Sequence, residues 1–355
     1  MESLRRELQQ ISRIILIRLR SLGDSILTLP LIEALHSWRP ELEMSVLIEA
    51  PFAPVFLHHP AVAETMILRS RKGTEPQAWT RMRAFRELRG RRYPAVLNLH
   101  GGTTSMLLTV ATGARMRLGQ ESHPGSWLYT ERIPSSVSIW SRQPLHTVEH
   151  QLSLMKWLGL PVPSPNATLH VSGDARARVR ERLADAGISE FVLIQPTATL
   201  PTKQWEPAKF AELGSQITAR YQLPVIYTAA PHETEVLREI EGSAKPRPLC
   251  WSDLPLMELF ALIESCRLFI GCDSGPTHAA AALKKPVVVV WGSSDFAAWH
   301  PWETEYEAVR SDLPCIPCPG YRCKAYGEPK CIRQIPVQKV ADACTRILAK
   351  TGVRC

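Results

Sequence analysis

Long apolar stretches are missing from this sequence of 355 residues. The only compact apolar run near its start is 14–17, which is too short for the core of a secretory signal. No run approaches the roughly 18 residues that a membrane-spanning helix needs. We therefore expect a cytoplasmic protein, or one bound peripherally to the inner face of the inner membrane.

The sequence also lacks the motifs of several common enzyme classes. No G-x-G-x-x-G follows an expected strand and no Walker A loop occurs, which disfavours dinucleotide oxidoreductases and P-loop kinases. No G-x-S-x-G elbow, H-E-x-x-H pair or metal-binding D-x-D motif is present. The chemistry must therefore be sought in other loops that follow strands.

The composition is that of an ordinary globular protein with a basic surface. Hydrophobic residues make up 45% and charged residues 21%, and the formal net charge is +8. This charge favours anionic partners such as nucleotide-sugars and phosphorylated lipids. No aromatic-interleaved basic motif or helix-turn-helix pattern points to nucleic acid. The nine cysteines are an odd number, which argues against a disulfide framework in a cytoplasmic chain.

Short β-rich runs alternate with amphipathic stretches, which predicts an α/β fold of βαβ units around parallel sheets. The expected strands are 14–18, 44–48, 64–68, 95–99, 191–195, 224–228, 268–271 and 287–291. The expected helices are 23–38, 77–90, 103–112, 175–186, 208–221, 233–241, 256–265, 277–283 and 337–350.

A proline-rich connector at 160–165 divides this pattern near its middle. We expect an N-terminal Rossmann-like domain over 1–162 and a second over 163–335, followed by a C-terminal helix within 336–355. Two doubly wound domains that face each other across a cleft are the natural assembly. Ligands of such sheets bind outside the carboxyl ends of the strands.

The loop after the first expected strand, 18–25, opens a helix and could carry chemistry. Gly23 permits a tight turn there, and Asp24 would place a carboxylate at the mouth of the cleft. Aspartate is also a favoured N-cap residue. The sequence therefore leaves two interpretations of Asp24, a helix cap and a catalytic base.

A second strand-to-helix junction, 271–278, leads into a run of alanines. Pro276 fits the first helical turn, and Asp273 or Ser274 fits the cap, so the segment predicts at least a well-formed helix start. Free backbone N–H groups and the helix dipole could instead bind a diphosphate there. The loop 196–205 adds hydroxyls and Lys203, which suit phosphate contact but form a weak pattern alone.

Taken together, these segments resemble the ADP-heptose:lipopolysaccharide heptosyltransferases of bacteria, glycosyltransferase family 9. The resemblance is carried by 17–30, 97–102, 117–119, 146–150, 157–160 and 273–292. It implies a GT-B fold, with the acceptor on the first Rossmann-like domain and the nucleotide-sugar on the second. It also implies that a heptose or related sugar moves from an ADP-sugar to a lipopolysaccharide core or similar glycolipid, with inversion and without a metal.

The resemblance also assigns roles to residues of this sequence. Asp24 takes the role of general base. The acceptor site would include Arg18, Arg20 and His100. The donor site would include Thr199, Lys203, Glu233, Asp273, Ser274, Gly275 and His278, with Glu235 as the alternative to Glu233. Arg18 and Arg20 differ from the motif of members that add the first core heptose, which leaves the sugar and the acceptor open.

A cysteine-bearing loop at 315–331 lies outside these motifs. Its thiols, at Cys315, Cys318, Cys323 and Cys331, have spacings that suit a structural zinc or iron–sulfur site, and four free thiols are the alternative. Two other functions stay open on the sequence alone. One is a nucleotide-sugar epimerase on the same fold, and the other is a non-enzymatic metal-binding interaction protein.

Basic residues also crowd one N-terminal segment, 69–92, where only Glu75 and Glu87 oppose them. They are Arg69, Arg71, Lys72, Arg81, Arg83, Arg86, Arg89, Arg91 and Arg92. A solvated helix face is one interpretation. The other is contact with an anionic membrane surface, to which each basic side chain can add about 1 kcal/mol.

Overall fold

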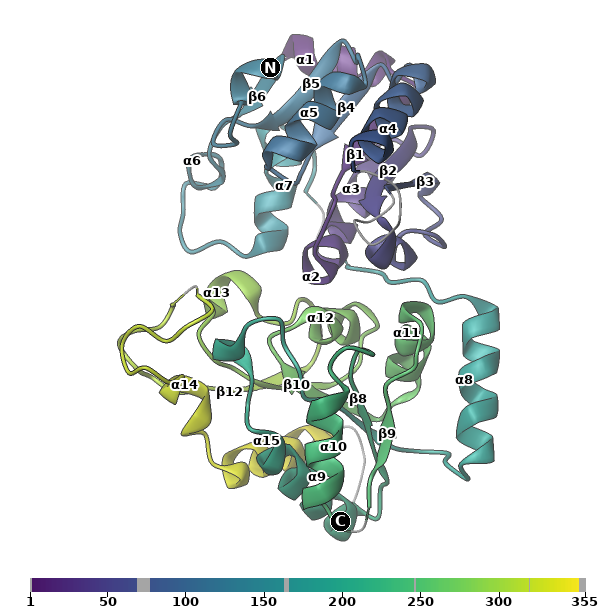
Figure 1. Ribbon diagram of the computed structural model, residues 1–355. Coiled ribbons are helices and arrows are strands. Elements are labelled where there is room, and N and C mark those ends of the chain that lie inside the picture. Colours follow the sequence, from purple (N-terminus) through teal and green to yellow (C-terminus); the bar gives the residue numbers. More distant parts are fainter. Residues whose placement is uncertain (1, 69–76, 163–165, 246, 319, 351–355) are drawn as a thin grey trace. The chain divides into compact units, whose positions relative to one another are not determined.

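The computed structural model describes residues 2–68, 77–162, 166–245, 247–318 and 320–350, with the backbone alone described for 77–81. The chain forms two compact units, Met1–His170 and Val171–Cys355. Figure 1 colours the first unit purple to teal and the second teal to yellow. The boundary predicted at 162–163 lies in the connector just before this division. Among the described helices, none has the length and apolar character to cross a membrane.

The first unit is built on a parallel six-stranded sheet with the order β3-β2-β1-β4-β5-β6. Its strands are β1 (Arg13–Ile17), β2 (Glu43–Glu49), β3 (Val62–Leu68), β4 (Ala95–Asn98), β5 (Met116–Gln120) and β6 (Glu131–Ile133). Its helices are α1 (Glu2–Gln10), α2 (Leu22–Ile26), α3 (Leu29–Trp38), α4 (Gln77–Arg91), α5 (Thr103–Ala111), α6 (Ser136–Trp140) and α7 (Thr147–Trp157), with 3-10 turns η1 (Ala50–Val55) and η2 (Ser126–Leu128).

The second unit repeats this plan with the order β12-β11-β10-β7-β8-β9. Its strands are β7 (Val192–Gln195), β8 (Val225–Thr228), β9 (Leu249–Trp251), β10 (Leu268–Cys272), β11 (Val287–Val290) and β12 (Tyr306–Val309). Its helices are α8 (Gly173–Asp185), α9 (Pro207–Tyr221), α10 (Thr234–Ser243), α11 (Leu256–Ser265), α12 (Gly275–Ala282), α13 (Phe296–Trp299), α14 (Lys330–Arg333) and α15 (Val337–Lys350), with the 3-10 turn η3 (Pro201–Lys203).

Counted within each unit, both sheets therefore have the strand order 3-2-1-4-5-6. The order reverses between β1 and β4 in the first unit, and between β7 and β10 in the second. A crevice forms at such a reversal, beyond the carboxyl ends of the two strands, and this is where doubly wound sheets bind ligands. The predicted α/β class with two Rossmann-like units is confirmed.

Continuous apolar runs form the central strands because helices cover both faces of a parallel sheet. All four valines of β11 are fully buried. α15 packs against α9, β11 and β12 and contributes a stripe of side chains to the same core. This stripe consists of Val340, Ala343, Cys344, Ile347 and Leu348.

The helix predicted over 23–38 is wrong as a single element, because the chain divides it into α2 and α3 with a turn at Leu27–Thr28. Pro30 explains the division. Proline has no N–H to donate to the carbonyl of Ile26, and its ring would clash with that carbonyl in a continuous helix.

Candidate active site

The first strand of the first unit delivers a buried arginine to the sheet reversal. After β1, the side chain of Arg18 is only 5% exposed, and its Nη1 lies 3.5 Å from Oδ1 of Asp24, whose side chain is 29% exposed. Ser21 donates to Oδ2 of Asp24 from both its backbone N–H (3.3 Å) and its hydroxyl (2.9 Å). The N-cap of α2 is therefore Ser21, and Asp24 stands three residues further on. The interpretation of Asp24 as the cap is wrong, although its carboxylate does reach back to the cap's N–H.

The neighbouring strand β4 brings His100 to the same place, since Asn98 pairs with Ile17 of β1. Asn98 is buried, and its Oδ1 accepts from the N–H groups of His100 (3.0 Å) and Gly101 (3.4 Å). Its Nδ2 donates to the hydroxyl of Tyr129 at 2.9 Å. A buried amide that is fully hydrogen-bonded fixes the loop on which His100 stands.

Gly101 is required in this loop for two reasons. Its φ is +73°, a conformation that favours glycine, and a Cβ atom there would lie 2.7 Å from the ring of His123. Burial, followed by the nearby Arg18 and His100, lowers the pKa of His123 from 6.5 to about 4. The ring is therefore neutral near pH 7.

The electrostatics show that the predicted acceptor residues lie together. Burial lowers the pKa of His100, the guanidinium groups of Arg18 and Arg20 lower it further, and Asp24 opposes them. Among the described residues, Nε of Arg18 and Nδ1 of His100 are buried without a hydrogen-bond partner. Buried polar atoms are seldom left unpaired, so these two are suited to a ligand that completes the site. Arg20 itself is exposed.

In the second unit, Asp273 follows β10 and is the centre of a charged cluster. It is 4% exposed, and its Oδ2 accepts from Nζ of Lys203 at 2.7 Å and from the hydroxyl of Ser294. Its Oδ1 lies 3.7 Å from Nε2 of His278. One carboxylate thus orients a lysine and a histidine toward the carboxyl ends of the strands.

The helix that follows, α12, begins as predicted, with Ser274 as its N-cap and Pro276 in its first turn. The hydroxyl of Ser274 does not cap the helix, because it donates to Oε1 of Gln195 at 3.2 Å. Among the hydrogen bonds of the described residues, none uses the N–H of Gly275 or Thr277. Such free N–H groups at the positive end of a helix dipole are suited to a phosphate.

In the loop after β7, the hydroxyl that contacts Glu233 is that of Thr197 and not that of Thr199, the residue that was predicted for the donor site. Thr197 is buried and donates to Oε2 of Glu233 at 2.7 Å, and the N–H of Ala230 donates to the same oxygen at 3.1 Å. Thr199 is exposed in the same loop. Of the two alternatives, Glu233 is tied to this loop, whereas Glu235 is exposed on α10.

Comparison with known proteins identifies the family of the chain that carries these two clusters. A family model described as glycosyltransferase family 9 (heptosyltransferase) matches residues 81–327. The chain belongs to glycosyltransferase family 9. It is thus a glycosyltransferase, and the epimerase and non-enzymatic alternatives are set aside.

Similar proteins agree with this assignment. This family 9 enzyme is 30% identical over 295 residues to the lipopolysaccharide heptosyltransferase 3 of Escherichia coli K12, covering 79% of this chain and 82% of that one. It is 26% identical to the lipopolysaccharide heptosyltransferase 1 of Pseudomonas aeruginosa, covering 88% and 87%.

Solved structures match the fold over nearly the whole chain. A glycosyltransferase family 9 structure from Veillonella parvula superposes with a TM-score of 0.84 at 19% identity, covering 96% of this chain and 98% of that one. The ADP-heptose lipopolysaccharide heptosyltransferase II of E. coli gives 0.77 at 20% identity, covering 95% and 99%. The predicted GT-B fold class is confirmed.

The cysteine-bearing loop of the family 9 enzyme lies beside the loops that carry the predicted donor residues. Cys318 N–H donates to the carbonyl of Ser293 at 2.7 Å, just after β11, and the Thr202 hydroxyl donates to the carbonyl of Gly320. Burial raises the pKa of Cys331, and Cys315 and Cys323 raise it further. Among the described residues, no three of the cysteine sulfurs lie within 4.8 Å of one another. A metal at this loop therefore stays a prediction.

The described residues do contain one group with such short ligand distances, Glu33, His59 and His170 in the first unit. Nδ1 of His59 accepts the N–H of Ala61 at 3.2 Å, so a neutral ring carries its proton on Nε2. That nitrogen faces Oε1 of Glu33 at 3.3 Å. A metal ion would need Nε2 without its proton, so the geometry suits a buried His–Glu contact better than a metal site.

Three residues that shape the site were missed from the sequence: Asn98, Thr197 and Ser294. Each stands at or soon after the carboxyl end of a strand, as the predicted residues do. A search of every such position, without regard to motif, would have found them.

Proposed function

We propose that this enzyme transfers a heptose from an ADP-heptose donor to a lipopolysaccharide core or a similar glycolipid, with inversion at the anomeric carbon. The names of its relatives support the sugar and the acceptor class. One similar E. coli heptosyltransferase structure contains ADP, and another contains ADP-2-deoxy-2-fluoro heptose. The observation in this chain that carries the proposal is the Asp273-centred cluster at the start of α12 in a family 9 enzyme.

On the donor side, the diphosphate would bind at the free N–H groups of α12, with Lys203 beside it. His278 and the hydroxyls of Ser274 and Thr199 would add hydrogen bonds. Asp273 is buried and negatively charged, so a direct contact with phosphate would be repulsive. We therefore assign Asp273 the positioning of Lys203 and His278, while Glu233 would hold the ribose or adenine.

On the acceptor side, Asp24 would act as the general base. Its carboxylate is oriented by Ser21 and Arg18, yet it is part exposed and can reach an incoming hydroxyl. Arg18 and Arg20 would bind anionic groups of the acceptor, and His100 would hydrogen-bond its hydroxyls.

The bonds then change as follows. The acceptor oxygen attacks the anomeric carbon from the face opposite the diphosphate and forms the new C–O bond. The old C–O bond breaks, and its electron pair leaves with ADP. The proton of the hydroxyl passes to Asp24, and the configuration inverts.

The charge that develops on the leaving diphosphate would be met by Lys203 and by the N-terminus of α12. Fixed donors aimed at developing charge supply a large part of catalysis in many enzymes. This arrangement supports a transfer that needs no metal ion.

The substitution Asp24→Asn tests this function. A positioned base contributes about 10²–10⁴-fold, so kcat should fall at least about 100-fold while the Kd for ADP stays within about twofold. Ser21→Ala is the matched control, because it removes a hydrogen bond to Asp24 and keeps the carboxylate. If transfer falls only in proportion to folded protein, Asp24 has a structural role and the base assignment is wrong.

For localisation, we propose that the enzyme is cytoplasmic and binds peripherally to an anionic leaflet through the basic segment 69–92. Within the described side chains of this segment, Arg83, Arg86 and Arg89 are exposed on α4. Arg69, Arg71, Lys72 and the side chain of Arg81 lie outside the described residues. The charge of a phosphorylated glycolipid acceptor supports such a surface.

A further inference from the structure

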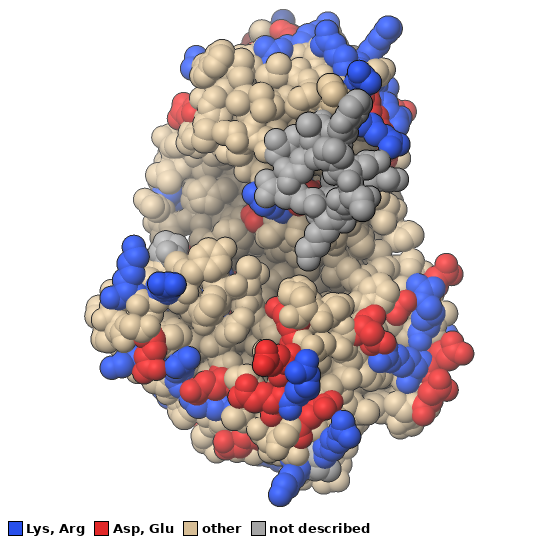
Figure 2. Space-filling view, in the orientation of Figure 1, with Lys and Arg blue, Asp and Glu red and all other residues tan. Residues whose placement is uncertain are grey.

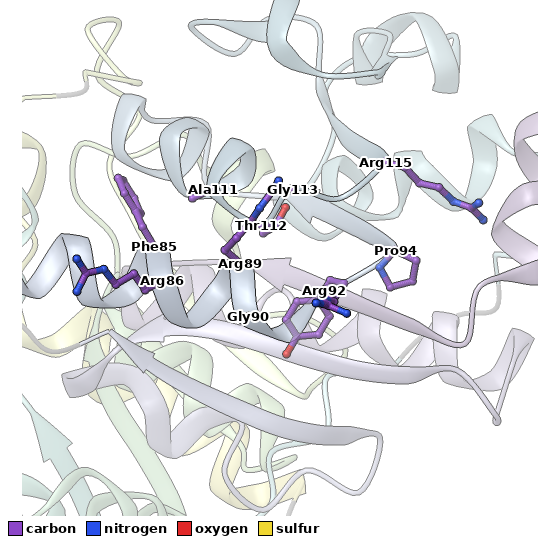
Figure 3. Close-up of a pocket in the computed structure, with 11 residues that line it drawn as sticks. Phe85, Arg86, Arg89, Gly90, Arg92, Pro94, Ala111, Thr112, Gly113 and Arg115 are labelled. Atoms are coloured by element: carbon purple, nitrogen blue, oxygen red, sulfur yellow. The ribbon is translucent and has the colours of Figure 1, made fainter.

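A large open groove lies at the edge of the first unit's sheet that is opposite the candidate active site. Its volume is about 1190 Å³. Pro94 and Arg115, which line it, stand just before β4 and β5, whereas the candidate site residues stand after the strands. Figure 3 shows the groove between the end of α4 and the turn that follows α5. The proposed transfer does not use this edge, although Arg86, Arg89 and Arg92 belong to the basic segment that we propose to contact a membrane.

Four arginines line the groove and no acidic side chain does. They are Arg86, Arg89, Arg92 and Arg115, and all are exposed. The nearest carboxylates along α4 and β3, Glu87 and Glu64, are both paired with Arg91, which is not a lining residue. Among the described residues, none of the four groove arginines forms an ion pair. Among the described carboxylates, none therefore compensates their positive charge.

Some other exposed arginines of the same chain do form ion pairs. On α8 of the second unit, Arg176, Arg178 and Arg182 contact Glu264, Glu258 and Asp253 at 2.6, 2.5 and 2.9 Å. Figure 2 shows red and blue atoms interleaved over the second unit, in the lower part of the view. The groove thus gathers four arginines without an ion pair on one surface, and this positive charge is suited to an anion.

The groove also has defined walls. In Figure 3, Arg89 extends from α4 toward Thr112 and Gly113. A Cβ atom on Gly113 would lie 1.5 Å from Nη1 of Arg89, so the guanidinium lies directly against this turn, where a φ of +63° favours glycine. Phe85 and Tyr93 add aromatic walls. The planar fork of a guanidinium can bind two phosphate oxygens at once.

We propose that this groove is a second anion site, which binds compounds carrying more than one phosphate charge. Arg86 and Arg115 stand at its two ends in Figure 3, so the groove suits an elongated ligand better than a single small ion. The phosphate can come from a soluble diphosphate or from a lipid headgroup. The site does not depend on the proposed transfer reaction and can be tested apart from it.

Inorganic pyrophosphate is the probe, titrated by calorimetry into the full chain. The donor site could also bind pyrophosphate, so the titration is run in saturating ADP and repeated in Lys203→Ala. The test variant is Arg92→Asn with Arg115→Gln, because asparagine tolerates the positive φ of 51° at residue 92. The control is Arg5→Gln with Arg132→Gln, an equal loss of charge at exposed residues outside the groove.

We expect binding that survives both ADP and Lys203→Ala, and that weakens at least about tenfold in the test variant but less than twofold in the control. A second arm uses vesicles of phosphatidylcholine with phosphatidic acid. If the test variant also sediments less with them, the source includes lipid headgroups, and if only pyrophosphate binding falls, the source is soluble.

Two outcomes would overturn the proposal. One is that no pyrophosphate binding is measured in saturating ADP, and that wild type and test variant bind vesicles equally. The other is an equal loss in test and control variants, which would leave only diffuse positive charge. Circular dichroism and transfer activity with a soluble acceptor check that both variants fold. If the test variant does not fold, Arg86→Gln with Arg115→Gln replaces it.

Discussion

Replacing His59 should make the enzyme less sensitive to acid. The side chain of His59 is fully buried, with Glu33 at 3.3 Å and the ring of His170 5.0 Å away between centroids. Burial, followed by the nearby His170 and His36, lowers its pKa from 6.5 to about 4. The unfolded chain therefore takes up a proton at this position between pH 6.5 and pH 4, while the folded chain does not. Folding stability must fall as the pH drops through this range.

The size of the effect follows from the two pKa values. Linkage with an unfolded value of 6.5 and a folded value of about 4 gives a loss of about 2 kcal/mol between pH 8 and pH 5. Carboxylates also titrate in this range, so the informative quantity is a difference between proteins. His59→Gln keeps an acceptor for the N–H of Ala61 and removes the proton-binding group. Between pH 8 and pH 5, the His59→Gln variant should therefore lose about 2 kcal/mol less folding stability than wild type.

Urea unfolding at pH 8 and pH 5 measures these losses, with the exposed neighbour His58→Gln as the matched control. The control should lose as much stability as wild type. The reasoning is refuted if His59→Gln loses as much as wild type on acidification. It is also refuted if His59→Gln loses more, because that sign would mean that Glu33 outweighs burial and raises the pKa of His59.

Three further predictions concern the two clusters and the surface. Lys203→Ala and His278→Ala should each weaken ADP binding about tenfold in calorimetry, and unchanged affinity in both would place the diphosphate elsewhere. Gly101→Ala should lower the free energy of unfolding by about 1–3 kcal/mol in urea, because its Cβ would meet His123 and its φ is +73°. A triple glutamine variant of α4 should sediment less with anionic vesicles at low salt, with the difference vanishing at high salt, and equal sedimentation at low salt would leave these side chains a solvated face. The three positions are Arg83, Arg86 and Arg89.

The central strands could be predicted from the sequence because parallel strands buried on both faces leave continuous apolar runs. The edge strand β3 was predicted as well, but the edge strands β6, β9 and β12 were missed, since they are short and partly exposed. The interior strand β5 was also missed, because Arg117 and Gly119 interrupt its apolar residues. The break between α2 and α3 was open to prediction from Pro30, but the apolar spacing on both sides of it favoured one helix.

For the site, sequence patterns located the loops but not the contacts within them. The motif around Asp273 predicted a helix start with a diphosphate site. It did not show that Asp273 itself is buried beneath Lys203 and His278, because that depends on loops from three strands meeting at one edge. The sequence also did not show which threonine of the loop contacts Glu233. Thr197 is buried and donates to Glu233, whereas Thr199, two residues further on, is exposed.

The place of α15 in the core has a consequence for how the protein is made. This helix follows all the other elements of the second unit in the chain, yet it contributes Ile347 and Leu348 to that unit's core. During synthesis, the first unit is complete when His170 has been added, whereas the second cannot close its core until α15 has left the ribosome. At roughly 5–20 residues per second, the first unit has several seconds or more in which to fold alone. The first unit would thus be native while strands of the second are still exposed, and the second unit is the one at risk of aggregation until its last helix arrives.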